Sequence, residues 1–219
     1  MKKIIYFFII ICFAISCGID NYDSPETVLS GNIVYNGENI QVMGTDGTVQ
    51  LELYQPGYDL TNSPITVYVA QDGSFQTKLF NGNYKLVATD GTGPWVSSHD
   101  TVKVVVSGNT TCEYQVTPYY TISDESFSLS GSTLTATFTI NYVAGSSDPA
   151  QAMLLVNNTA FVDEIVYMER TEIDSPGIGQ VTMTIDLSDE TLSSVLVNAR
   201  IGVKIEGEQA IYSSVQQIK

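Results

Sequence analysis

Basic residues are scarce in this chain: nine Lys and Arg stand against 24 Asp and Glu, for a net charge of -15. Nucleic acid binding needs clustered Lys and Arg to neutralise phosphate, so the composition argues against such a partner. Histidine and cysteine are also scarce, with one His and three Cys. We therefore expect no metal centre built on these residues and no bound cofactor.

The three cysteines are not expected to form a disulfide that stabilises the fold. Cys12 lies in an N-terminal apolar run, and Cys17 follows that run directly. If the run is removed and Cys17 is modified, Cys112 stands alone and no disulfide within the chain is expected. Cys112 alternates with Tyr114 and Val116. This spacing predicts a small core residue on a strand.

Residues 1–16 have the organisation of a secretion signal. Lys2 and Lys3 precede an apolar run over 4–15, and Ser16 stands before Cys17. The run is shorter than the about 20 apolar residues that span a membrane. This pattern resembles a bacterial lipoprotein leader, and the resemblance implies cleavage before Cys17 and lipidation of its side chain. The alternative is an ordinary secreted protein with a cysteine there by chance.

Residues 17–27 are expected to form an acidic tether. Asp20, Asp23 and Glu26 resemble the surface-export tethers of lipoproteins from gut bacteria that import glycans. Without the leader, seven basic residues remain against 24 acidic ones, a net charge of -17. Anionic lipid would repel such a body, so acyl chains on Cys17 must supply the membrane link. We expect lipid anchoring in the outer membrane, on the cell surface.

Residues 28–117 have the pattern of a β-sandwich. Short alternating runs are separated by turn signals such as Asp72-Gly73, and no stretch has a helical period. Asn81-Gly82 is the kind of pair that closes a hairpin. Gly31, Asp72-Gly73-Ser74-Phe75 and Gly82-Asn83-Tyr84-Lys85-Leu86 resemble the core motif of carboxypeptidase-regulatory-like (transthyretin-like) domains. Members of that family are usually accessory modules without catalysis.

Residues 118–219 predict a second sandwich, because Pro118 ends a strand and further alternation follows. The alternation is most regular over 133–142, and strands are also expected at 152–156, 165–168, 181–187 and 195–205. Ser188 is placed to cap one helical turn. The fold class is therefore all-β, with two tandem sandwiches, the second of them like an immunoglobulin or fibronectin-III domain.

The order of leader, tether and two sandwiches along the chain resembles a family of uncharacterised two-domain lipoproteins that accompany SusC/SusD-type glycan uptake systems. The pieces that carry the resemblance are 20–25, Asp72-Gly73-Ser74-Phe75 and Val116-Thr117-Pro118-Tyr119. It implies an accessory part in nutrient capture, with SusC/SusD-like proteins or a glycan as partner. The alternative is a fimbrial or adhesion subunit, or a structural subunit of the envelope.

The single histidine, His99, is flanked by Ser98 and Asp100. Neighbouring residues on an extended chain point apart, so this adjacency does not predict a catalytic triad. Acidic pairs occur throughout an acidic chain, and none stands out as the two carboxylates of a glycosidase. We expect a protein that is not an enzyme, with no catalytic residue.

Glycan binding proteins usually offer an exposed aromatic ring to a sugar face. Trp95, the single tryptophan, lies in a Gly- and Pro-containing segment, and Tyr119 and Tyr120 lie at the domain junction. These three side chains are the ligand-binding candidates. The alternative is that they cap the sandwiches or pack between the domains.

Overall fold

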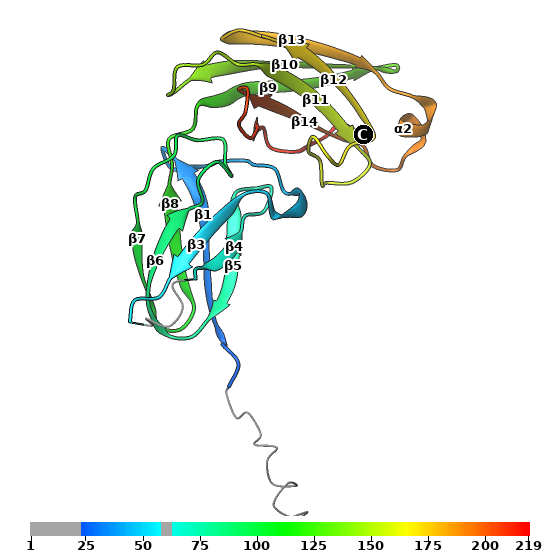
Figure 1. Ribbon diagram of the computed structural model, residues 1–219. Helices are drawn as coiled ribbons and strands as arrows, with labels where there is room; N and C mark the ends of the chain where they lie inside the picture. The colour runs from blue at the N-terminus through cyan, green and yellow to red at the C-terminus, as the bar shows by residue number, and fades with distance from the viewer. Residues whose placement is uncertain (1–22, 58–62) are drawn as a thin grey trace, which may run out of the picture.

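The computed structural model describes residues 23–57 and 63–219, and within them the chain is almost entirely β-structure (Figure 1). Cys17, the expected leader and most of the expected tether lie outside the described residues. None of the helices in the described part is long and apolar enough to cross a membrane. The predicted all-β fold of two consecutive sandwiches is confirmed.

The first domain packs two four-stranded sheets. In one sheet, β1 pairs antiparallel with β5 and parallel with β8. The strands of this sheet are β1 (Thr27–Tyr35), β2 (Glu38–Asn39), β5 (Ser74–Leu79) and β8 (Thr110–Gln115). The other sheet has the order β4-β3-β6-β7, formed by β3 (Gln50–Tyr54), β4 (Ile65–Tyr68), β6 (Gly82–Ala88) and β7 (Val102–Val106). A 3₁₀ turn, η1, spans Thr45–Gly47.

The motif residues of the first domain have clear packing roles. Gly73 has a φ of 79° and closes the tight turn predicted at Asp72-Gly73, where Asp72 accepts hydrogen bonds from Ser74. Phe75 is buried beneath Gly31. A β-carbon at Gly31 would lie 2.0 Å from the backbone oxygen of Cys112, so only glycine fits where β1 and β8 approach.

The hairpin predicted at Asn81-Gly82 is wrong. The strands on either side belong to different sheets, because β5 pairs with β1 whereas β6 pairs with β3 and β7. The pair therefore crosses between the sheets, and Gly82 does not have a positive φ. The Asn81 side chain instead accepts a hydrogen bond from Gly108 N at 2.9 Å, which ties this crossing to the next one along the chain.

The second domain packs a three-stranded sheet on a five-stranded one. The first has the order β13-β10-β9, formed by β9 (Tyr120–Ser130), β10 (Thr133–Tyr142) and β13 (Gly179–Asp186). In the second, β11 pairs with β12 and β14, and β14 also pairs with β15 and β16. Its strands are β11 (Gln151–Asn157), β12 (Glu169–Asp174), β14 (Asn198–Lys204), β15 (Ile211–Tyr212) and β16 (Gln216–Gln217).

The alternation over 133–142 is confirmed in β10, where Leu134, Ala136, Phe138 and Ile140 are fully buried. Burial of one large apolar side chain contributes about 1.5–3 kcal/mol, so this strand anchors the core. The expected helical turn is α2 (Asp189–Ser193), and Ser188 caps it through Thr191 N.

Two predicted strands differ from the structure. The segment 165–168 forms bends rather than a strand, because the residues before it are held in a loop. Asp163 accepts a hydrogen bond from Thr45 N of the first domain, and Phe161 O accepts one from the Asn157 side chain. The strand expected over 195–205 is β14 and begins at Asn198, since α2 and the bend after it occupy the preceding residues. Apolar spacing alone could not separate these segments from strands.

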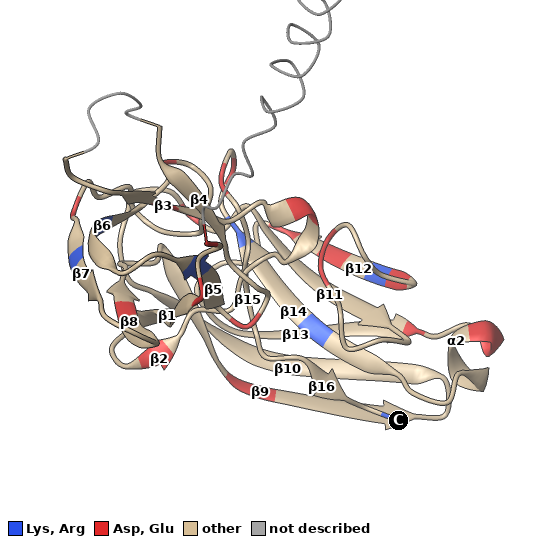
Figure 2. Ribbon diagram, turned by 90° about the horizontal axis from the view of Figure 1, so that it is seen from below, with Lys and Arg blue, Asp and Glu red and all other residues tan. Residues whose placement is uncertain are grey.

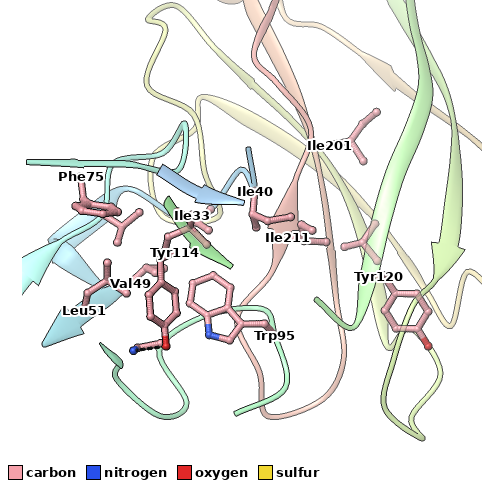
Figure 3. Packing of buried hydrophobic residues seen from close by; sticks show 14 of the residues in the cluster. Ile33, Ile40, Val49, Leu51, Phe75, Trp95, Tyr114, Tyr120, Ile201 and Ile211 are labelled. Atoms are coloured by element: carbon pink, nitrogen blue, oxygen red, sulfur yellow. Dashed lines mark hydrogen bonds between the residues drawn. The ribbon is translucent and has the colours of Figure 1, made fainter. Parts of the chain in front are cut away.

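The buried apolar residues of the two domains form one continuous cluster. Figure 3 shows Ile40 of the first domain beside Ile211 of the second, with Ile33 next to Ile40. The junction itself is hydrogen-bonded rather than free, because Val96 N donates to Thr117 O at 3.0 Å. The two domains therefore share one core and are joined by a hydrogen-bonded connection. Together these contacts hold the domains in one relative orientation.

Candidate functional site between the two domains

The domain interface is organised around Arg200, a fully buried side chain on β14. Its Nε donates to Ser213 O at 3.0 Å, and its Nη1 donates to Val162 O at 2.8 Å. Its Nη2 donates to two carbonyl oxygens of the first domain, Val42 O at 3.1 Å and Gln71 O at 2.8 Å. One guanidinium thus joins four backbone carbonyl groups from both domains.

The surroundings keep this buried cation charged. Burial lowers the pKa of Arg200 to about 10, while Tyr212, Asp163 and Asp72 act in the opposite direction. The guanidinium carbon lies 4.3 Å from the centre of the Tyr212 ring, a cation–π contact. Burial in turn raises the pKa of the Tyr212 hydroxyl. At neutral pH Arg200 is protonated, and the oxygens to which it donates are neutral carbonyl or amide oxygens.

Asp163, also fully buried, closes the other side of the interface. Its Oδ2 accepts from Thr45 N at 3.1 Å and from Thr45 Oγ1 at 2.7 Å, both in the first domain. Its Oδ1 accepts from Ile165 N and Val166 N at 3.0 and 2.9 Å. The carboxylate therefore shapes its own loop and binds the η1 turn at the same time.

A groove with a volume of about 380 Å³ lies along this interface. The first domain contributes Tyr35, Asn36, Glu38, Asn39, Ile40 and Gln41 from the end of β1 and the β2 region. The second domain contributes Thr121, Ile122 and Glu125 of β9 and the segment 211–214. Its walls therefore exist only when the two domains are packed together.

The groove combines apolar side chains with polar and acidic ones. Amide groups come from Asn36, Asn39 and Gln41, and exposed carboxylates come from Glu38 and Glu125 on opposite walls. Figure 2 shows these acidic positions on β2 and β9. No Lys or Arg belongs to the described lining. The groove thus presents many hydrogen-bond acceptors and several donors at fixed positions, which suits a ligand rich in hydroxyl groups.

The aromatic residues predicted from the sequence lie elsewhere. Trp95 is 5% exposed and packs in the shared core, bridging to Pro118. Tyr120 is 2% exposed and lies edge-on to Tyr142. Neither ring has an exposed face for a sugar, so the binding role predicted for them does not fit this structure. They pack at the junction, as the alternative interpretation held.

Tyr119 is half-buried, and its role in binding stays a prediction. Burial raises the pKa of its hydroxyl, and Glu208 raises it further through its charge and a hydrogen bond of 3.4 Å. The ring also lies against Gly145, where a β-carbon would be 2.9 Å from Cδ1. Tyr119 does not belong to the described lining of the groove.

The other sequence candidates can be placed as well. His99 is exposed, and its Nδ1 lies 3.7 Å from Asp90 Oδ2, whereas Ser98 Oγ donates to Asp100. Cys112 is half-buried on β8, and burial raises the pKa of its thiol. Among the described residues, no group of three or more His, Cys, Asp and Glu could hold a metal ion.

Sequence reasoning missed the groove and Arg200. The groove residues come from three segments that only the domain packing brings together, and none has a motif. Arg200 did leave a signal, because it is a charged residue between Ala199 and Ile201 in an apolar run. A strand buried on both faces with one central arginine predicts a buried polar contact at that position.

In a comparison with known protein families, each of the two domains matches a family profile. Residues 27–117 match the profile described as the N-terminal domain of a protein of unknown function, DUF3823, and residues 120–217 match the domain described as DUF3823_C. A comparison with curated proteins gives no match.

Several crystal structures are similar over nearly the whole chain. A DUF3823 family protein from Parabacteroides merdae is 40% identical with a TM-score of 0.85, covering 90% of this chain and 100% of its own. Another from Bacteroides ovatus is 31% identical with a TM-score of 0.81, covering 88% of this chain and 98% of its own. A third, from Bacteroides uniformis, is a protein for which carbohydrate binding has been suggested; it is 19% identical with a TM-score of 0.73, covering 90% and 100%, and shows the shared fold.

Proposed function

The chain belongs to the two-domain DUF3823 family, and from this starting point we propose that it is a glycan-binding accessory lipoprotein of the bacterial outer membrane. It is anchored through Cys17 and works beside a SusC/SusD-type uptake system. It binds its glycan in the groove between the domains and does not cleave it.

The observation that carries this proposal is the groove lined by both domains. Sugars offer many hydroxyl groups, and amides and carboxylates such as Asn39, Gln41, Glu38 and Glu125 can donate to or accept from them. The walls are held in place by Arg200 and by the shared core. A preformed site lowers the entropy cost of binding, which favours useful affinity from a shallow surface.

Binding without cleavage is supported by the setting of the two carboxylates. Glycosidases need one carboxyl group kept protonated near neutral pH, usually by burial against apolar groups. Glu38 and Glu125 are both exposed, and they stand on different domains. Exposed carboxylates on two separate walls suit hydrogen bonding to a ligand.

The position of the groove fits a tethered protein. Strand β1 begins at Thr27, at the end of the first domain far from the second, and runs to Tyr35 in the groove (Figure 1). Eight residue steps at about 3.3 Å span roughly 26 Å. An anchor at Cys17 would thus join the pole opposite the groove and leave the groove facing away from the membrane.

A titration of the mature chain against plant and host polysaccharide fragments, followed by calorimetry, tests the proposal. The double variant Glu38→Ala with Glu125→Ala should bind the best fragment about tenfold more weakly, about 1.4 kcal/mol. Glu206→Ala, an exposed acidic residue away from the groove lining, is the matched control and should bind as the wild type does. No binding across the panel, or equal binding by the double variant, would overturn the proposal.

A further inference from the structure

Tyr68, on the edge strand β4, is the most exposed aromatic side chain in the described part of the first domain. It is 59% exposed. One side of its ring lies on Gly47, where a β-carbon would be 2.4 Å from Cδ1 and 2.7 Å from Cε1. Gly47 has a φ of 59°, so the chain there favours glycine. The ring is therefore supported from behind and open to solvent elsewhere.

Tyr68 borders two surface hollows. One, of about 480 Å³, is lined with Gly44, Asp46 and Gly47 of the η1 region. The other, of about 340 Å³, lies over the outer side of the β1 sheet. Its polar lining comes from Ser30, Asn32, Ser74, Gln76 and Thr111.

The second hollow is uncharged, which distinguishes it from the interdomain groove. All its polar side chains are hydroxyls or amides, and they come from three adjacent strands, β1, β5 and β8. Such groups can both donate and accept hydrogen bonds without favouring a charged ligand. The neighbouring strands fix their spacing, because Ser30 pairs with Gln76 and with Thr111 in the sheet register.

An open aromatic ring beside neutral hydrogen-bonding groups has a defined chemical fit. A pyranose ring offers an apolar face of C–H groups and a rim of hydroxyl groups. The apolar face gains burial against an aromatic ring, while the rim needs partners at the side. Because Gly47 already supports the Tyr68 ring, little side-chain freedom is lost on binding.

We propose that Tyr68 is the stacking platform of a second glycan-contacting site, and that this site takes an uncharged sugar ring whose hydroxyl groups reach the side chains of the second hollow. The inference rests on the proposed function, since both sites would serve the same class of ligand. It adds a site on the first domain alone and the chemical class of sugar that the site accepts.

Calorimetry with uncharged hexasaccharides of glucan, mannan and xylan tests the site. Tyr68→Ala should weaken binding of the best hexasaccharide about tenfold, while Tyr68→Phe, which keeps the ring, should stay within about twofold of the wild type. Phe80→Ala is the matched control, because Phe80 is also aromatic and 47% exposed but does not line either hollow. Melting temperatures of all variants verify that folding is intact. Gln76→Ala should weaken binding as well, and it provides a second variant if Tyr68→Ala does not fold.

The outcomes separate this site from the groove. Loss of affinity in Tyr68→Ala or Gln76→Ala, with Phe80→Ala unchanged, supports the platform. Unchanged affinity in both, while the Glu38 and Glu125 double variant loses binding, would overturn the platform and leave the groove proposal standing. If the wild type binds no hexasaccharide, the uncharged-sugar platform is wrong. Binding of another polysaccharide fragment that is lost in the Glu38 and Glu125 double variant would still support the groove.

Discussion

Arg200 and Gln71 hold the two domains together by hydrogen bonds that each makes across the interface. Arg200 Nη2 donates to Gln71 O at 2.8 Å, across the interface. The Gln71 side chain reaches back, donating to Ala160 O at 2.7 Å and accepting from Val162 N at 3.3 Å. Separating the domains would exchange these hydrogen bonds for bonds to water, and each of them contributes about 0.5–1.5 kcal/mol net to holding the domains together. The groove is therefore expected to keep its shape without a ligand.

Replacing Arg200 should destabilise the whole molecule. In Arg200→Met the carbonyl groups of Val42, Gln71, Val162 and Ser213 lose their donor while staying buried, so we expect a loss of about 3 kcal/mol in the free energy of unfolding. Urea unfolding followed by fluorescence measures it. The matched variant is Arg170→Met on β12. Arg170 is partly exposed and paired with Glu172, so its loss should cost less than about 1 kcal/mol. Similar losses in the two variants would contradict the assigned role of Arg200.

Gly31→Ala should be severely destabilising. The added methyl group would lie 2.0 Å from the Cys112 backbone oxygen and 2.5 Å from Cζ of Phe75, and the backbone contact cannot be relieved by a side-chain rotation. We expect a loss of about 3 kcal/mol or more. Thermal unfolding of Gly31→Ala beside Ser30→Ala measures it, since Ser30 is the next residue and points outward. Equal melting temperatures would show that β1 and β8 are not packed as closely as described.

Glu169 should make stability depend on acidic pH. Burial alone would raise the pKa of Glu169, but hydrogen bonds from Thr191 and Ser188 outweigh it and lower the pKa. A lowered pKa in the folded state means that the stabilisation is present above the carboxyl's ordinary pKa of about 4.3 and is lost as pH falls through the lower folded pKa. Glu169→Gln should therefore be less stable than the wild type at pH 7, and the difference should shrink in acid. Parallel stability profiles from pH 7 to pH 3 would contradict this.

The anchor can be tested separately from the fold. Cells expressing the full chain and fed an alkyne fatty acid should label the wild type and the Cys112→Ala variant equally. The Cys17→Ala variant should not be labelled and should leave the membrane fraction. Labelling of Cys17→Ala would show that the acyl chains are carried elsewhere or that Cys17 is not the anchor.

The sequence predicted what depends on local periodicity. β10 and β13 alternate apolar and polar residues because one face of each is buried, and Ser188 caps α2 through contacts within four residues. The hairpin predicted at Asn81-Gly82 was wrong, because a turn-forming pair does not reveal whether the next strand stays in the same sheet. The groove could not be predicted at all, since its walls are brought together only by domain packing around Arg200.

Hydrogen exchange of the mature chain, with and without its best-binding glycan, tests the central claim that the ligand lies between the domains. The account predicts slower exchange at 35–41 and 121–125, the segments that form the two walls of the groove. Saturating glycan that leaves exchange in both segments unchanged would contradict it.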